Sequence, residues 1–339
     1  METRPPGLSD AGVAAAVSRG WGVTDPEVAH LPVGFGSHHW SVRVADGRRW
    51  IASLDAAPEG SEVHARLQAA LTAATVARES GLAFVVAPLR TAAGRVTHHV
   101  DATYALALYP HVAGQPGSFH ARHDLTSARG LVERLAVLHT ATSDLLDRGA
   151  RPSVDDLRVP GRTTLLAGRD GTWSGPYGPH LQSVLRSHAS TVEAALRAHD
   201  EALSDAGDQH DRLVVTHGEP HPGNLIRTPD GLVLVDWDTT RLAPPERDVW
   251  HVLARLEPED ARDVTALYAE RTGRPLEPAL VERYRLAWAL TDVAGFVEVL
   301  RQTPEETADT ATAWESLVGT LEERAARHTS PNSGRIVGH

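Results

Sequence analysis

The spacing of apolar residues changes near residue 110, and this change constrains the fold more than any other feature of the chain. Before it, short apolar runs separated by turns predict β-strands, interrupted by one helical pattern at residues 60–80. After Gly114 the spacing is mostly helical, apart from a non-helical stretch at residues 212–238, which we call the island. The sequence therefore predicts an α+β fold with two lobes, a small β-rich N-terminal lobe and a larger, mostly helical C-terminal lobe.

The same pattern sets the expected boundaries. The predicted segments are an N-terminal lobe at residues 1–109, a connector at 110–114, a C-terminal lobe at 115–327 and a tail at 328–339. Strands are expected at residues 30–33, 40–44, 50–54, 84–88 and 103–109, and in the island at 213–216 and 232–235. A helix capped by Ser9 or Asp10 is expected to end before Gly20, and one long helix is expected at residues 180–204. A cleft between two lobes is a common place for a small-molecule site.

Composition narrows the classes of function. A net charge of −11 over 339 residues argues against binding to nucleic acid or to an anionic membrane surface. No apolar run approaches the roughly 20 residues of a membrane span, and the N-terminus lacks a signal-peptide pattern, so a cytoplasmic protein is expected. The absence of cysteine excludes disulfides and thiolate chemistry. The expected partner is a small molecule, and the expected state is a monomer or homodimer.

The chain also contains no lysine, so all 33 basic residues are arginine. Any mechanism that depends on a lysine ammonium group is therefore excluded.

Polar residues with a recognisable chemistry follow the two predicted strands of the island. Glu219 and Asn224 follow the first strand, and Asp236 follows the second. Two carboxylates and an amide oxygen are the base and the oxygen ligands that magnesium-dependent phosphoryl transfer requires. The spacing from His217 to Glu219 and Asn224 also matches the catalytic loop of kinases. We therefore interpret Glu219 as the catalytic base, and Asn224 and Asp236 as the metal ligands.

Other interpretations of the island are weaker. His217 and His221 could suggest a zinc site, but the intervening Gly218, Pro220 and Pro222 are incompatible with the helix of zinc-binding HExxH motifs. A plain turn between strands would not explain the Asn224 and Asp236 spacing. His217 is expected to brace the loop, and Arg247 with Asp248 is expected to form an ion pair that holds it.

Five motifs in this order resemble the aminoglycoside phosphotransferase family of small-molecule kinases, and within it the spectinomycin-kinase-like branch. They are GFGSHHW at 34–40, LAVLH at 135–139, THGEPHPGN at 216–224, VDWD at 235–238 and PPERD at 244–248. The resemblance covers nearly the whole chain except the tail. It implies a two-lobed protein-kinase-like fold, ATP or GTP with Mg²⁺ as cofactors, and a hydroxyl group of a small molecule as the phosphate acceptor.

The resemblance also implies a nucleotide site in the N-terminal lobe. Gly34, Gly36 and Ser37 would cover the phosphates, and Pro110 and Val112 of the connector would contact the base. Ser53 stands where kinases carry the phosphate-clamping lysine. Arg66 is our candidate for the missing positive charge. A solvent-facing pair of Arg66 with Glu62, one helical turn away, is the competing interpretation.

In this family the acceptor lies between the island and the C-terminal helices. The expected acceptor-binding residues are Asp238, Trp288, Asp292 and Glu298. The competing interpretation is that the aromatic residues of this helix, Tyr284 and Trp288, belong to the core.

The most specific expectation is an ATP- or GTP-dependent phosphotransferase that modifies an antibiotic and confers resistance. The antibiotic would be an aminoglycoside, an aminocyclitol or a nucleoside. Two departures from the family keep alternatives open, because Glu219 stands where aspartate is usual and the clamping lysine is missing. The alternatives are a metabolite kinase of the same fold and a degraded pseudokinase that binds nucleotide or ligand without turnover.

Overall fold

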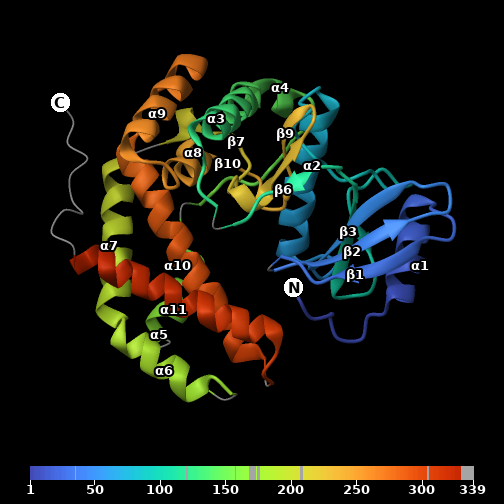
Figure 1. Ribbon diagram of the computed structural model, residues 1–339, viewed down its shortest axis with the longest axis horizontal. Helices are drawn as coiled ribbons and strands as arrows, with labels where there is room; N and C mark the ends of the chain where they lie inside the picture. Colours follow the sequence, from blue (N-terminus) through green and yellow to red (C-terminus); the bar gives the residue numbers. More distant parts are fainter. Residues whose placement is uncertain are drawn as a thin grey trace. The chain divides into compact units, whose positions relative to one another are not determined.

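The computed structural model describes residues 1–34, 36–119, 121–156, 158–167, 173, 176–206, 209–303 and 305–329 (Figure 1). The chain forms two compact units, each assembled from two stretches of sequence. The first unit comprises residues 1–155 and 208–277, and the second comprises residues 156–207 and 278–339. These limits differ from the predicted lobe boundaries at residues 109 and 115, which remain a prediction.

The N-terminal part of the first unit is a five-stranded antiparallel sheet in the order β1-β2-β3-β5-β4. The strands are β1 Glu27–Leu31, β2 His38–Arg43, β3 Arg49–Ala56, β4 His98–His99 and β5 Tyr104–Pro110. The hairpin expected at Asp46-Gly47 joins β2 to β3, and Gly47 adopts a φ of 89° that favours glycine. In this register Ser53 of β3 lies opposite His39 and Ala107.

One helix packs on each face of this sheet (Figure 1). On one face, α1 (Asp10–Trp21) buries Val13 and Val17 against Trp40, Leu54 and Leu106. On the other, α2 (Glu62–Glu79) packs its buried face with the alternate residues of β5. Because side chains alternate along a strand, Ser53 and the residues two positions away on β3 point away from the face that α1 covers.

Two elements differ from the sequence prediction. Helix α1 is capped by Ser9 as expected but ends at Trp21, because Gly22 adopts the left-handed conformation that stops it. Gly20 is inside the helix, where its lack of a side chain admits His98. The strand expected at residues 84–88 is wrong. This segment forms only a single parallel bridge, between Val85 and Leu234.

The rest of the first unit combines helices with the small strands of the island. The helices are α3 Leu125–Thr140, α4 Thr142–Asp147, α8 Glu246–Leu253 and α9 Pro258–Thr272, with short 3₁₀ turns at His210–Arg212 and Pro222–Asn224. The strands are β6 Gln115–Pro116, β7 Val214–Thr216, β8 Leu225–Thr228, β9 Gly231–Leu234 and β10 Arg241–Ala243. The sheets are β6-β8-β9 and β10-β7. The sequence predicted β7 and β9 and missed β8 and β10, which are short. Together with the N-terminal sheet, these elements confirm the α+β class.

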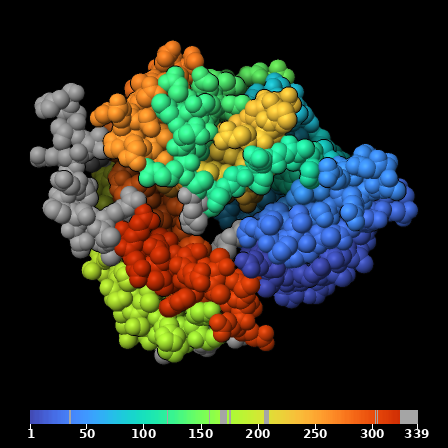
Figure 2. Space-filling view, in the orientation of Figure 1, coloured from blue at the N-terminus to red at the C-terminus, as the bar shows by residue number. Residues whose placement is uncertain are grey.

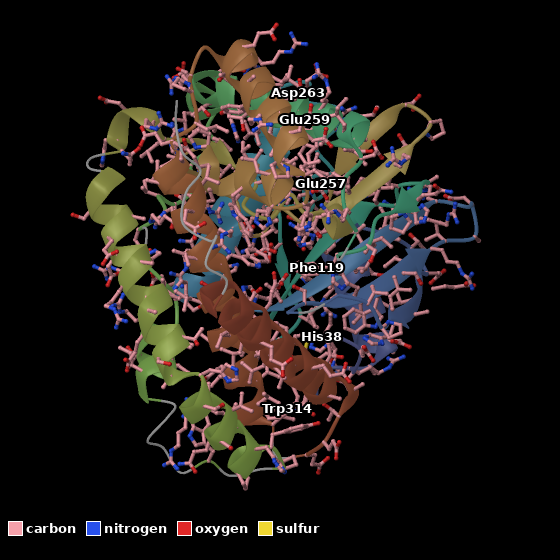
Figure 3. The ribbon with its side chains drawn as sticks, turned by 60° about the vertical axis from the view of Figure 1, so that its left-hand side comes forward. His38, Phe119, Glu257, Glu259, Asp263 and Trp314 are labelled. Carbon is pink, nitrogen blue, oxygen red and sulfur yellow. The ribbon has the colours of Figure 1, made fainter. Side chains whose placement is uncertain are left out.

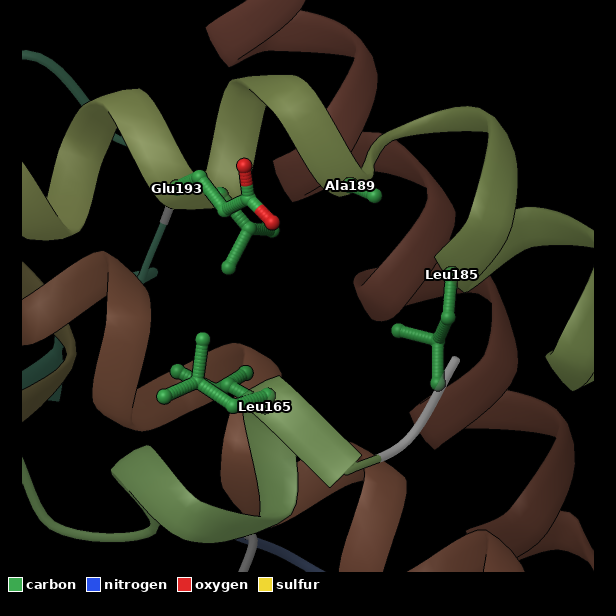
Figure 4. A pocket seen from close by; sticks show the side chains of 6 residues that line it. Leu165, Leu185, Ala189 and Glu193 are labelled. Carbon is green, nitrogen blue, oxygen red and sulfur yellow. The ribbon is translucent and has the colours of Figure 1, made fainter. Parts of the chain in front are cut away.

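The regular secondary structure described in the second unit is all helical and consists of α5 Arg162–Ala167, α6 Gly178–Ser187, α7 Ala189–Ala206, α10 Pro278–Gln302 and α11 Ala308–Thr329. The single helix expected at residues 180–204 is wrong, because His188 separates α6 from α7. A small pocket lined mainly by leucines and Val192 lies between α5, α6 and α7, with Glu193 at its edge (Figure 4). In the described part of the chain, no helix is both long and apolar enough to cross a membrane.

Candidate active site

The loop after β7 fixes the backbone of Glu219 through three hydrogen bonds. The Glu219 N–H donates to Nδ1 of His217 at 3.1 Å. Its carbonyl accepts from Nδ2 of Asn224 at 3.0 Å and from the N–H of His221 at 2.8 Å. The side chain of Glu219 remains 29% exposed. The structure therefore brings Glu219 and Asn224 together. The backbone of Glu219 is held by hydrogen bonds, whereas its side chain is accessible to solvent.

His217 joins this loop to the strand that leads to Asp236. Its Nε2–H donates to the carbonyl of Val235 at 2.9 Å, and its ring lies against Trp237 with the ring centroids 4.5 Å apart. Burial lowers the pKa of His217 to about 4, so the ring is neutral at physiological pH. These contacts agree with the bracing role expected from the sequence.

Asp248 holds the same loop from below. Its carboxylate accepts from the backbone N–H of His217 at 2.9 Å and of Gly218 at 2.6 Å. It also accepts from Nε2 of His139 at 3.0 Å, and Nδ1 of His139 accepts from the hydroxyl of Tyr268 at 2.9 Å. Burial acts to raise the pKa of the Asp248 carboxyl, but the hydrogen bond from His139 and nearby positive charges outweigh it and lower that pKa.

Arg247 also holds this loop, but its hydrogen-bond partners are residues other than Asp248, the partner expected from the sequence. Its guanidinium donates to Oγ1 of Thr216 and to the carbonyl of Thr239, both at 2.8 Å. It packs directly on Gly218, where φ is 104° and an added Cβ would lie 2.5 Å from a guanidinium nitrogen. Glycine is therefore required here for both its backbone and its size. Both Arg247 and Asp248 thus support the loop, but mainly through separate contacts rather than as one ion pair.

The charges of three other carboxyl groups, those of Asp238, Glu219 and Asp55, act on Asp236 beside this loop. Burial and then the charges of Asp238, Glu219 and Asp55 raise the pKa of Asp236 well above its ordinary value. Burial also raises the pKa of Asp238. The pKa of Asp55, on β3, rises to about 7 through burial and the charge of Asp238, although Ser37 donates a hydrogen bond to it at 2.5 Å. Ionisation of these three aspartates is therefore disfavoured, because neighbouring positive charges do not fully offset the effect of their burial.

The donor set of Asn224 and Asp236 fits a magnesium ion. Amide and carboxylate oxygens are hard ligands, and Mg²⁺ bound with nucleotide phosphates takes only one or two protein ligands. A divalent cation would offset both the burial and the repulsion from other carboxylates that raise the pKa of Asp236. Among the described residues, no three His, Asp or Glu side chains are arranged to hold a metal by themselves.

The residues predicted for the nucleotide are placed as follows. Gly34 and Gly36 have φ values of 79° and 95°. Ser37 immediately precedes β2, and its hydroxyl donates a hydrogen bond to the carboxyl group of Asp55. Ser53 lies two residues before Asp55 on the same side of β3. Pro110 ends β5, and Val112 is partly exposed beyond it.

Arg66 lies on α2 and forms an ion pair with Glu62 at 3.1 Å, with 44% of its own side chain exposed. This geometry is that of the competing surface-pair interpretation. The phosphate-binding role of Arg66 remains a prediction.

The predicted acceptor residues lie in different units. Asp238 belongs to the first unit, beside Asp236. Trp288, Asp292 and Glu298 lie along α10 of the second unit, where Glu298 pairs with Arg301 at 3.1 Å. Their shared role remains a prediction. Tyr284 is 5% exposed, which fits the core interpretation.

Sequence reasoning missed four residues that the structure places around the loop. They are Asp55, Tyr109, Phe119 and Tyr268. Burial and the charges of Asp55, Asp236 and Asp238 raise the pKa of Tyr109, so this tyrosine lies near the carboxyl cluster. Asp55 could have been found, because it shares the parity of Ser53 in an otherwise apolar strand.

The chain matches one family model over most of its length. The sequence model described as the phosphotransferase enzyme family matches residues 27–286. A curated relative, Protein StrN of Streptomyces griseus, is 26% identical over 316 residues, which cover 88% of this chain and 87% of StrN.

Two solved structures have the same fold over nearly their whole length. A spectinomycin phosphotransferase in complex with ADP and spectinomycin superposes with a TM-score of 0.71 at 12% identity, covering 94% of this chain and 98% of that one. A microcompartment-associated aminopropanol kinase superposes with a TM-score of 0.65 at 16% identity, covering 97% of this chain and 100% of that one. The kinase-like phosphotransferase fold is thereby confirmed.

Proposed function

The chain belongs to the phosphotransferase enzyme family, and we propose that it transfers the γ-phosphate of ATP or GTP to a hydroxyl group of an antibiotic. The acceptor would be an aminoglycoside, an aminocyclitol or a nucleoside antibiotic, and the modification would confer resistance. The similarity to a spectinomycin phosphotransferase supports this choice of acceptor class.

One observation carries the proposal. The hydrogen bond from Asn224 Nδ2 to the carbonyl of Glu219, at 3.0 Å, ties the proposed metal ligand to the proposed base within one rigid loop. The partly exposed Glu219 carboxylate would then meet an incoming hydroxyl group, and Oδ1 of Asn224 would bind the metal. This is the division of roles that phosphoryl transfer requires.

Glu219 would orient the acceptor hydroxyl and take its proton. The acceptor oxygen forms a bond to the γ-phosphorus, the bond from that phosphorus to the bridging oxygen breaks, and the nucleoside diphosphate leaves. A loose transition state needs only a weak base, so the main contribution of Glu219 is position.

Asn224 and Asp236 would hold Mg²⁺, which when bound neutralises the charge of the phosphates. In the absence of the ion, burial and the neighbouring carboxyl charges raise the pKa of Asp236. Asp238, held beside it, would face the acceptor. Gly34, Gly36 and Ser37 would cover the phosphates, with Ser53 behind them.

Arg66 would supply the positive charge that the missing lysine normally provides, since its guanidinium fork suits phosphate. Pro110 and Val112 would contact the purine through a carbonyl and an N–H group. A several-fold rise in nucleotide KM for Arg66→Ala, without a change for Glu62→Ala, tests the clamp. An unchanged KM for Arg66→Ala would contradict it.

Purified protein with Mg²⁺ and either ATP or GTP, incubated with antibiotics of each class, tests the function. Phosphate transfer is read by mass spectrometry, and protection is read in a susceptible bacterium. Transfer to an amino alcohol alone would favour a metabolite kinase, for which the similarity to an aminopropanol kinase is the specific support. Nucleotide binding without transfer to any acceptor would favour a pseudokinase.

A further inference from the structure

Phe119 leaves an unusual amount of aromatic surface in contact with solvent. Its side chain is 40% exposed, and it is the only aromatic residue among the large exposed hydrophobic residues in the described part of the chain. It lies in the segment between β6 and α3 (Figure 3). Apolar surface exposed beside a predicted active site is typical of a ligand contact.

The segment that carries Phe119 is anchored on the catalytic loop. The N–H of Gly117 donates to the carbonyl of Leu225 at 2.9 Å, and β6 pairs with β8. An added Cβ at Gly117 would lie 2.1 Å from the carbonyl oxygen of Pro222, so only glycine allows this approach. Figure 2 shows the chain after β5, in green, lying against the yellow β8–β9 hairpin. The position of Phe119 is therefore fixed by the same loop that presents Glu219.

The ring contacts of Phe119 lead directly to Glu219. Phe119 meets His221 edge to face, with the ring centroids 4.7 Å apart and an interplanar angle of 72°. Nε2 of His221 lies 4.0 Å from Oε2 of Glu219. Phe119 and His221 thus form a continuous aromatic wall beside the base.

A cation lies against the same ring from within the protein. The guanidinium carbon of Arg255 is 5.7 Å from the centroid of Phe119. A second cation, from a ligand, would be repelled by Arg255 and would compete for the electron-rich ring face. The wall therefore favours an uncharged, apolar part of a ligand over an ammonium group.

We propose that Phe119 is a specificity-determining residue that stacks on a saturated ring of the acceptor and selects cyclic acceptors over open-chain amino alcohols. The inference rests on the proposed function, because it takes Glu219 as the point where the hydroxyl is delivered. The C–H face of a cyclitol or sugar ring buries apolar area on Phe119, while the hydroxyl at its edge reaches Glu219. A three-carbon amino alcohol has little apolar area to bury and carries its ammonium group close to the hydroxyl.

The test compares spectinomycin and streptomycin, as cyclic probes, with 1-amino-2-propanol. Steady-state kinetics are measured for wild type, Phe119→Ala, Phe119→Tyr and Val137→Ala. Val137 is the matched control, since it is an exposed apolar residue of the same unit on the surface of α3. Binding of the same probes is measured by calorimetry with a non-hydrolysable ATP analogue present.

We expect wild type to use at least one cyclic probe with a higher kcat/KM than 1-amino-2-propanol. Phe119→Ala should raise the KM and the calorimetric Kd of that probe by about tenfold, in the range expected for losing one aromatic contact. Nucleotide KM should stay unchanged. Phe119→Tyr, which keeps the ring, and Val137→Ala should resemble wild type.

Two results would overturn the inference. One is a preference of wild type for 1-amino-2-propanol. The other is that Phe119→Ala binds the cyclic probes with the same Kd as wild type. Failure of these probes to bind wild type at all would count against the inference in the same way. Failure of the proposed function looks different. In that case no acceptor is phosphorylated, and a loss of cyclic-probe binding in Phe119→Ala would still support the inference.

Discussion

His139 and Asp248 are joined by a hydrogen bond of 3.0 Å between two side chains that are 2% and 0% exposed. They come from α3 and α8, and through Asp248 they hold the backbone of the loop that carries Glu219. A buried carboxylate that accepts three hydrogen bonds is satisfied, whereas the same group with fewer donors would be costly. The loop geometry therefore depends on residues that touch no substrate.

The first prediction concerns this network. Asp248→Asn should lower the free energy of unfolding by about 3–5 kcal/mol, because one N–H donor of the new amide must face another donor. Tyr268→Phe should cost about 1 kcal/mol, since the hydrogen bond to His139 Nδ1 is lost. Urea unfolding monitored by circular dichroism provides the measurement. Asp263→Asn, which removes an exposed partner of Arg129, is the control and should change stability by less than about 0.5 kcal/mol. Equal effects in Asp248→Asn and the control would contradict the role of the network.

The second prediction concerns pH and His217. Its folded pKa of about 4 is below the unfolded value of about 6.5, so the unfolded chain binds more protons between these values. The stabilisation is fully present above pH 6.5 and is lost as pH falls towards 4. Wild type should therefore lose about 2 kcal/mol more than His217→Asn between pH 7 and pH 5. Parallel stability curves for the two proteins over this range would disprove the assignment.

Much of the fold follows from the sequence because local rules decide it. Ser9 caps a helix where a short polar side chain precedes an apolar pattern, and Gly47 turns the β2–β3 hairpin. The strand expected at residues 84–88 failed for a tertiary reason. Its apolar residues are buried against the island rather than paired in a sheet, and apolar content alone does not distinguish these two cases.

The site residues that lie within one loop could be predicted from the sequence. Those that come from separate helices, strands or loops could not. Glu219 and Asn224 lie five residues apart, so spacing alone relates them. Asp55 comes close to Asp238 from β3, and Phe119 contacts His221 from the segment after β6, and only the folded chain creates these contacts. Likewise, the sequence suggested a pairing of Arg247 with Asp248, but the loop's backbone N–H groups are the main partners of Asp248.

The third prediction concerns the effect of Asp236, a proposed metal ligand, on the stability of the fold. Asp236 has a pKa raised well above its ordinary value, so its ionised form destabilises the fold at neutral pH. Asp236→Asn removes that charge, and asparagine tolerates the φ of 67° that Asp236 adopts. The variant should gain about 1–2 kcal/mol and a Tm higher by about 2–8 °C, while phosphate transfer is lost. Calorimetry at pH 7.5 and the transfer assay measure the two effects. A variant that is less stable, or fully active, would be inconsistent with this account.

The last prediction concerns the length of Glu219. Its N–H is held by His217, and its carbonyl by Asn224 and His221, so the backbone cannot shift to compensate for a shorter side chain. Glu219→Gln keeps the size but removes the base, so kcat should fall by about 10²-fold or more while nucleotide binding is retained.

Glu219→Asp restores the residue that is usual in the family, but it withdraws the carboxylate by about one bond length. A misplacement of about 1 Å can cost on the order of 10²-fold in rate, so this variant should also lose kcat. Single-turnover kinetics at saturating nucleotide, with the acceptor identified in the antibiotic assay, separate the chemical step from binding. Near wild-type kcat in Glu219→Gln would move the base elsewhere, with Asp238 the next candidate. A Glu219→Asp variant faster than wild type would mean that the site is not matched to glutamate, and that the longer side chain marks partial loss of an aspartate-based mechanism.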